Sequence, residues 1–332
     1  MQKSLVFSVV FVSVSLLAYL FVEVFNLLLM VFAGLLVGVL FIALAKKIQR
    51  LVRMPYLLAL TISVLAYFSF IGGLFYLVGD TLHSEVDDFV KKIPEIKANV
   101  ESRLEGTTVY GWVKDQVEEG ASDSQAGTRY FTKFFSSTFG VFGDLYAVIF
   151  IGLFFAVSPK EYFKGAVILL PEEAKKKGEQ VLMALYINLK TWLKSQLLEM
   201  LIMFGLTAVA LLLVGLDYWL VLALITALFC FIPNIGPMIA LVPMVAVGLL
   251  QEPMMALWVF LAFMGVQLLE TGFIGPYIRK KMLSLPPALV LFVQLVLGAT
   301  CGMIGVLLAT PLLVVIIVLV QKLYLGRSKD EI

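Results

Sequence analysis

Phe-Ile-Pro-Asn-Ile-Gly-Pro, residues 231–237, interrupts an apolar segment that runs from Leu220 to Leu250. Proline removes a backbone donor and disfavours helical geometry in the residue before it, and glycine permits turns that other residues resist. In lipid the freed backbone groups need other partners, so broken helices at membrane depth occur where protein or a wet cavity surrounds them. We interpret this stretch as a break in a membrane helix.

The composition indicates a membrane protein and argues against several classes of function. The chain has 332 residues, of which 61% are hydrophobic and 14% charged, as in polytopic membrane proteins. A net charge of +2 without a basic patch does not indicate a nucleic-acid partner. The sequence has no phosphate loop, zinc signature or nucleophile–base pair, and its two cysteines lie in apolar runs. We therefore expect neither an enzyme nor a bound cofactor or metal.

Four apolar runs in the N-terminal half have the length of membrane crossings: Leu5–Val22, Leu27–Ala45, Tyr56–Val78 and Val141–Val157. The first is longer than the apolar core of a signal peptide, so an uncleaved helix is expected. Basic residues follow the second run. By the positive-inside tendency, that loop and the N-terminus are predicted to be cytoplasmic.

The third run leads to residues 80–138, which contain more acids than bases and are predicted to lie outside the cell membrane. Apolar residues recur there at intervals of three and four, which predicts a small cap of amphipathic helices. The single histidine, His83, has no partner histidine or cysteine, so a metal role is not expected. Residues 159–195 combine many lysines with an apolar stripe, which predicts a cytoplasmic amphipathic linker at the membrane interface.

Two interrupted segments follow in the C-terminal part. Leu197–Val214 is predicted to cross outward. The next arm, Leu220–Ile232, is too short to span a core of about 30 Å at 1.5 Å per helical residue, which predicts a helical hairpin. Met254–Ile274 is predicted to cross inward. The last block, Ala288–Val320, is too long for one crossing and is interrupted by three glycines and a proline, which predicts a second hairpin. Each hairpin is either re-entrant or a pair of full crossings, because both leave the C-terminus in the cytoplasm.

The whole pattern predicts an all-α polytopic membrane protein with about six full transmembrane helices, two helical hairpins and a small helical extracytoplasmic insert. Paired interrupted segments point to a midplane binding site in secondary transporters. The predicted parts are N-terminal helices at 1–79, the insert at 80–138, a transmembrane helix at 139–158, the linker at 159–195, a candidate transport domain at 196–325 and a cytoplasmic tail at 326–332.

Polar side chains inside apolar runs are the first candidates for function, because they are costly in lipid. Gln196 and Glu199 begin one predicted crossing, and Gln267 and Glu270 repeat the same spacing near the end of another. Residues three apart lie on one face of a helix. Either Glu199 or Glu270 carries a proton or cation, or both sit at the interface with ordinary ionisation or basic partners.

The predicted hairpin tips, Pro233–Pro237 and Gly302–Pro311, supply further candidates. Asn234 either binds a solute or caps the broken helix. The tip glycines are expected to permit close backbone packing, and the threonine either offers its hydroxyl to a solute or bonds its own backbone. The candidate pathway residues are Gln196, Glu199, Pro233, Asn234, Gly236, Pro237, Gln267, Glu270, Gly302, Gly305, Thr310 and Pro311.

These motifs resemble the autoinducer-2 exporter (AI-2E) family of permeases. The resemblance is specific from Trp192 to Pro311 and concerns only layout in the N-terminal half. Ser195 stands where the family often has glycine, and Thr271 stands where an asparagine is common. The matching motifs are Trp192-Leu-Lys-Ser-Gln196, Ile232-Pro-Asn-Ile-Gly-Pro237 with Pro243, Gln267-Leu-Leu-Glu270 with Pro276, and Gly302-Met-Ile-Gly305 with Leu308-Ala-Thr-Pro311.

The resemblance implies a multi-pass transporter of the inner cell membrane, a homo-oligomer whose two hairpins form an elevator-like moving domain. Its members are associated with export of autoinducer-2, a small polar quorum-sensing signal. The alternative with the same architecture is a sodium/proton antiporter that uses Glu199 or Glu270. An alternative from another class is a membrane scaffold whose outer insert binds a partner. The expected partners are the lipid bilayer, a small polar solute, and sodium or protons.

Overall fold

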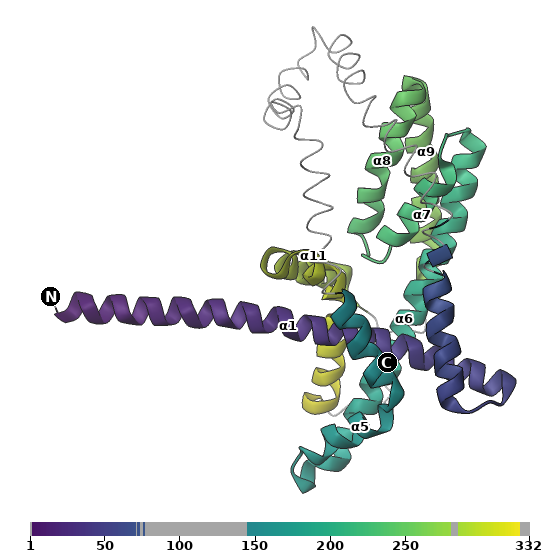
Figure 1. The fold of residues 1–332 in the computed structure, drawn as a ribbon. Helices are drawn as coiled ribbons and strands as arrows, with labels where there is room; N and C mark the ends of the chain where they lie inside the picture. Colours follow the sequence, from purple (N-terminus) through teal and green to yellow (C-terminus); the bar gives the residue numbers. More distant parts are fainter. Residues whose placement is uncertain (1, 71, 74–75, 77–144, 280–284, 326–332) are drawn as a thin grey trace.

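The computed structural model describes residues 2–70, 72–73, 76, 145–279 and 285–325. The predicted outer insert and cytoplasmic tail lie outside these residues. Every regular element among the described residues is helical, as predicted. Four of the described helices are long and apolar enough to cross a membrane, or five if one bent pair counts as a span. Figure 1 shows the long first helix crossing between the α7–α9 group on one side and α5 with the end of α11 on the other.

Helix α1 (Gln2–Val52) is one continuous helix of 51 residues. The predicted break between the two crossings, Leu5–Val22 and Leu27–Ala45, is therefore wrong. The four residues between those runs include neither proline nor glycine, so nothing interrupts the helical hydrogen bonds there. At 1.5 Å per residue α1 is about 75 Å long, more than twice the thickness of the hydrocarbon core.

The C-terminal half of α1 packs against two shorter helices, Tyr56–Phe70 and Leu145–Val157. The hydroxyl of Tyr56 donates to the carbonyl of Ala156 at 2.7 Å, and that of Ser63 donates to the carbonyl of Phe41 at 3.1 Å. A Cβ placed on Gly152 would lie 2.8 Å from the Gly34 carbonyl oxygen. The glycines therefore let these two backbones approach closely, as in other membrane helix pairs.

Helix α5 (Pro159–Ile168) bends by 87° from the preceding Leu145–Val157 helix and is followed by α6 (Glu172–Val214). The predicted linker and the predicted crossing Leu197–Val214 are joined in α6 as one helix of 43 residues. Gly215 ends it with a left-handed φ of 78°, the usual device at a helix C-terminus. Because α6 touches α1, α5, α7, α9 and α11, it is the element around which the others are placed.

The first predicted hairpin is present. Helix α7 (Trp219–Phe229) runs into a tight turn, and α8 (Ile235–Gln251) returns beside it. Helix α9 (Pro253–Leu269) packs on α8 and α6 and continues through a π-helical turn, η1 (Glu270–Ile274), into α10 (Gly275–Arg279). Buried side chains from α6, α7, α8 and α9 and from the turn between α6 and α7 form the core of this group: Leu211, Leu216, Leu222, Ala240, Met244, Val259 and Phe263.

The second interrupted segment is α11 (Pro287–Leu319), which ends in a π-helical turn, η2 (Val320–Tyr324). Its helical geometry breaks at Gly302, where φ is 62° and ψ is −147°, a conformation essentially confined to glycine. The predicted tip Gly302–Pro311 is therefore too long: the chain turns at Gly302, and Pro311 lies buried within the second arm. The fixed φ of proline, near −65°, fits a helix, whereas the backbone of Gly302 does not.

A central cluster of buried apolar side chains joins α1, α6 and the second arm of α11. Around it pack half-buried residues from both hairpin tips, Phe231 and Cys301. The tips are thus held against one core, although Phe231 and Cys301 lie 70 residues apart in the sequence. The cluster consists of Leu29, Leu36, Val39, Leu189, Trp192, Leu193, Leu308, Val314 and Val318.

Candidate functional site

The tip of the first hairpin is a γ-turn centred on Asn234. The φ and ψ angles of Asn234 are 68° and −50°, and the amide of Ile235 donates to the carbonyl of Pro233 at 2.8 Å. This type of γ-turn is rare and strained, because a side chain is disfavoured at positive φ. Strained backbone persists where the surroundings hold it, often at functional sites. Here two neighbouring helices, α6 and α11, hold the strained turn in place.

Helix α6 fastens one side of this tip. The buried Gln196 side chain donates from Nε2 to the carbonyl of Cys230 at 2.7 Å. Trp192, one turn earlier, meets the Phe231 ring edge-on at a centroid distance of 5.8 Å. Cys230 ends α7, so its carbonyl is among those left without a helical partner, and the glutamine supplies a donor for it. Gln196 was a predicted site residue, and its observed role is to hold the turn.

Helix α11 fastens the other side through Gln294, a residue that sequence reasoning missed. Its Nε2 donates to the Pro233 carbonyl at 3.1 Å, and its side chain is only 1% exposed. Its Oε1 is buried and accepts no hydrogen bond from the described part of the chain. The sequence offered one signal of a role for Gln294, since it is a lone amide in the apolar run Leu289–Leu297. The run has no second polar residue at helical spacing that would draw attention to it.

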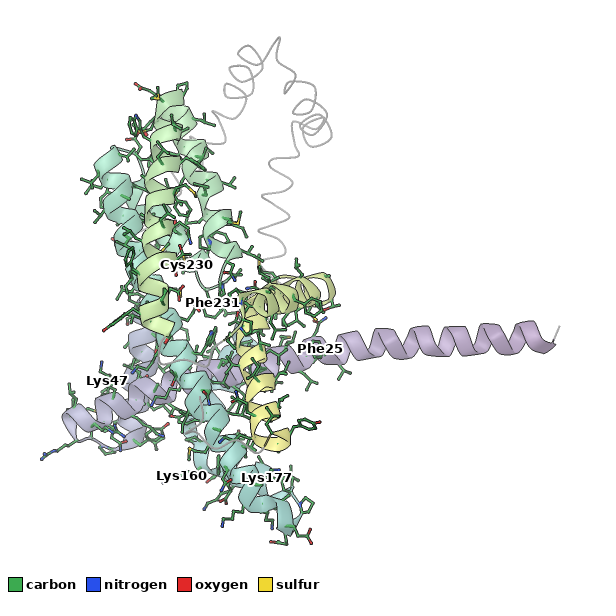
Figure 2. All side chains as sticks on the ribbon, turned by 180° about the vertical axis from the view of Figure 1, so that it is seen from behind. Phe25, Lys47, Lys160, Lys177, Cys230 and Phe231 are labelled. Carbon is green, nitrogen blue, oxygen red and sulfur yellow. The ribbon has the colours of Figure 1, made fainter. Side chains whose placement is uncertain are left out.

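Figure 2 shows Cys230 and Phe231 where the α7–α9 group approaches α11. The hydrogen bond from Gln294 to Pro233 crosses this junction, so the two hairpins meet. They meet by the first arm of α11 against the tip of the first hairpin. Gln294 lies eight residues before Gly302, so the contact is more than two helical turns away from the second tip.

The two hairpins share a way of closing. A Cβ on Gly236 would lie 1.8 Å from the Phe229 carbonyl oxygen, and a Cβ on Gly305 would lie 2.2 Å from the Leu297 carbonyl oxygen. In both cases a glycine of the returning arm touches the backbone of the first arm. These distances agree with the sequence prediction that Gly236 and Gly305 permit close backbone packing. Gly302 differs, because it is exposed and supplies the turn itself.

The second predicted pair, Gln267 and Glu270, lies on α9 and the π-helical turn that follows it. Gln267 donates from Nε2 to a carboxyl oxygen of Glu270 at 3.3 Å, and the Thr271 hydroxyl donates to the Gln267 carbonyl at 2.5 Å. Glu270 is 5% exposed. Single π-helical turns are frequent at functional sites. The carboxyl group of Glu270 is thus buried among protein side chains, and both alternatives for it, a proton or cation carrier or an interfacial residue, stay predictions.

Both candidate acids lie near the first hairpin. The carboxyl groups of Glu199 and Glu270 are close enough to the Cys230 thiol to act on it electrostatically, and Cys230 packs against Met203 of α6 and Val266 of α9. Glu199 is half-buried. The two acids and Gln267 thus approach the tip from the side of α6 and α9, whereas Gln294 approaches it from α11.

The remaining predicted residues divide into buried and exposed ones. Thr310 is 4% exposed, and its hydroxyl has no hydrogen-bond partner within the described residues, so of the two alternatives for it the bond to its own backbone is not observed. Asn234 occupies the N-cap position of α8, but its exposed side chain makes no capping hydrogen bond. Pro237 and Pro311 are buried, and Pro233 is half-buried and contributes its carbonyl. In the described ranges no group of three or more metal-ligating side chains occurs.

Comparison with known proteins addresses the family. The sequence model of the AI-2E family transporters matches residues 5–325, nearly the whole chain. The chain belongs to this family. The match includes both hairpins and α1, so the earlier resemblance, which was specific only from Trp192 to Pro311, extends over the N-terminal half as well.

Curated relatives agree with membership of the AI-2E family. The chain is 26% identical over 287 residues to "Putative transport protein YueF" of Bacillus subtilis strain 168, an alignment that covers 82% of this chain and 76% of that protein. It is 28% identical over 160 residues to "Putative transport protein YrrI" of the same organism, covering 48% and 45% of the two chains. A Borreliella burgdorferi protein named "Putative transport protein" is 31% identical over 140 residues, covering 41% and 37%. This AI-2E family member is a multi-pass membrane transporter.

Proposed function

We propose that this AI-2E family member is a secondary transporter that exports a small, uncharged polar solute such as autoinducer-2 through the junction of its two hairpins. The observation that carries the proposal is the hydrogen bond from Gln294 to Pro233, which joins two broken helices inside an apolar protein. Broken helices that converge in this way form the binding sites of many secondary transporters.

The unpartnered buried groups of the second hairpin favour a neutral solute with hydroxyl groups. The second hairpin carries two buried oxygens without hydrogen-bond partners in the described chain, Oε1 of Gln294 and Oγ1 of Thr310. They lie eight residues before and eight residues after Gly302, one in each arm. Buried polar atoms without partners are costly, and a solute that donates hydrogen bonds to them removes that cost.

An elevator-like movement fits how the hairpins are built. Within each hairpin a glycine holds the two arms in direct backbone contact, which makes the hairpin a rigid unit. Between the hairpins the connection includes a side-chain hydrogen bond, which is readily broken and remade. We propose that the hairpins move as units against α1 and the N-terminal helices, a movement in which the second arm of α11 slides along α1 within the central cluster.

We also propose a homo-oligomer in the inner cell membrane, with both chain ends in the cytoplasm. The N-terminal half of α1 projects clear of the other described helices in Figure 1, which leaves its length free for contact with lipid or with another copy. The basic residues that follow α1's apolar run, and those of α5 and α6, support the orientation.

The test is solute flux in proteoliposomes. Vesicles loaded with labelled autoinducer-2 should lose it faster with the wild-type protein than without protein, and Gln294→Leu should slow the loss. Gln251→Leu is the matched control, because Gln251 hydrogen-bonds at the far end of the first hairpin, to Asp217 and Gly215. The proposal fails if wild-type vesicles leak no faster than empty ones.

The same vesicles separate the alternatives. A sodium/proton antiporter would move sodium when a pH gradient is imposed, and Glu270→Gln would abolish that flux while leaving autoinducer-2 retained. A scaffold would move neither solute, and Glu270→Gln would leave both measurements at the level of empty vesicles. Export of a neutral solute predicts release of autoinducer-2 without a pH-driven sodium flux.

A further inference from the structure

A second group of polar side chains lies between α1 and α6 and shares no residue with the hairpin junction. The Tyr186 ring of α6 has the Lys46 ammonium of α1 at 5.3 Å from its centroid and the Lys190 ammonium of α6 at 5.9 Å. Because both distances refer to one centroid, the two nitrogens lie within about 11 Å of each other. Two helices far apart in sequence thus bring two positive charges to one aromatic ring.

The charges of this group are not balanced locally. Among the described residues neither Lys46 nor Lys190 forms an ion pair with a carboxylate, and the salt bridge found there joins Lys175 to Glu172, at the start of α6. The nearest acid before Tyr186 on α6 is Glu179, seven residues earlier, or about 10 Å along the helix axis. Lys47, Arg50 and Arg53 add positive charge at the end of α1. Like charges repel, so this arrangement favours an anion between them.

The phenol provides a third, independent sign of a ligand. The hydroxyl of Tyr186 is buried and has no hydrogen-bond partner in the described chain, although tyrosine hydroxyls usually find one when buried. The ring is half-buried and Lys46 is exposed, so the group is open on one side. A phosphate group carries several acceptor oxygens, so different oxygens can pair with the two ammonium groups and with the phenol.

The position in the chain selects the source of that phosphate. Lys46 follows directly on the apolar part of α1, and Lys190 precedes the apolar part of α6, so both sit where a membrane helix leaves the hydrocarbon. Figure 2 shows Lys47, the neighbour of Lys46, near the end of α1 and away from the hairpin junction at Cys230. Basic clusters between helices at this level bind anionic lipid headgroups.

We propose that Lys46, Tyr186 and Lys190 bind the phosphate of an anionic phospholipid headgroup at the membrane surface. The lipid headgroup bridges the two helices and holds α1 against α6. This site is separate from the hairpin junction and does not depend on which solute the protein moves.

The experiment compares two double variants with the same charge change on the same two helices. Lys46→Gln with Lys190→Gln removes the proposed site, whereas Lys47→Gln with Lys194→Gln removes two neighbouring lysines without a described contact to Tyr186. The purified protein in neutral detergent is titrated with phosphatidylglycerol or with phosphatidylcholine, and the bound lipid is counted by native mass spectrometry. Tyr186→Phe tests the hydroxyl separately.

The wild-type protein should bind phosphatidylglycerol in preference to phosphatidylcholine. The site double variant should bind phosphatidylglycerol about 10-fold or more weakly, and the control double variant within about twofold of wild type, since two direct charges are lost only in the former. Tyr186→Phe should weaken binding by a smaller factor. Equal losses in both double variants, or equal binding of the two lipids, would overturn the proposal. Displacement of the lipid by millimolar inorganic phosphate would overturn the lipid assignment by showing a site for a free anion.

Discussion

Replacement of Gln294 by leucine should release the tip of the first hairpin without unfolding the protein. The variant removes the hydrogen bond from Nε2 to the Pro233 carbonyl. That carbonyl still accepts from the Ile235 amide at 2.8 Å, so the substitution leaves no orphaned acceptor. Leucine fills a similar volume, and it also removes the unpartnered Oε1.

The size of the effect follows from measured hydrogen bonds between membrane helices. These average about 0.6 kcal/mol and reach about 1.7 kcal/mol. At 1.4 kcal/mol for each factor of ten, the population of the released tip should rise between about 3-fold and about 16-fold.

The native cysteines provide the assay. Cys230, buried at 4% exposure, lies at the end of α7 directly before the γ-turn, and Cys301 is changed to serine so that a single thiol remains. When opening is fast relative to reaction, the rate of maleimide labelling of Cys230 follows the released population. The rate should rise by the same 3- to 16-fold in Gln294→Leu and stay unchanged in Gln251→Leu. An unchanged rate in Gln294→Leu, or an equal rise in the control, would refute the assignment of Gln294 as the contact that holds the tip.

Three further predictions concern the packing of the site. Gly236→Ala and Gly305→Ala should each destabilise the protein by at least about 1–3 kcal/mol, because their Cβ atoms would lie 1.8 and 2.2 Å from backbone oxygens. Gly205→Ala and Gly265→Ala are the controls, because a Cβ added at these positions meets nothing within 4 Å. Thermal unfolding in detergent compares the two pairs, and equal midpoints would contradict the hairpin geometry. Trp192→Ala should lower the free energy of unfolding by about 3–5 kcal/mol, since Trp192 is 2% exposed in the central cluster. Trp258→Ala, at a position 56% exposed, should lower it much less. A small loss of stability in Trp192→Ala would show that the cluster does not hold the tip. Asn234→Gly should raise the unfolding midpoint because glycine adopts a φ of 68° without strain, and Asn234→Val should lower it. A lower midpoint for the glycine variant would argue against the strained turn. If Asn234→Gly also slows solute release, the exposed amide contacts the solute.

The sequence by itself determined the class of protein and the places where its membrane helices break. Long apolar runs require helices in lipid, because every backbone polar group must be satisfied internally, and this property is local to each run. Pro233, Gly236 and the glycines of α11 marked both hairpins for the same local reason, since the backbone freedom of a residue is fixed by its own side chain.

Only the tertiary structure decided how these parts meet. The continuity of α1 through residues 23–26 is again a local property, because no proline or glycine occurs there, although hydropathy alone predicted a break. Gln294 looked like an isolated amide in an apolar arm, and its partner, the Pro233 carbonyl, lies 61 residues away. The pairing of Gln196 with Cys230 and the burial of Glu270 likewise depend on how α6 and α9 pack around the turn. Periodicity describes which residues share a face of one helix, whereas contacts between helices arise from packing across the whole chain, and it is there that the two hairpins become one candidate site.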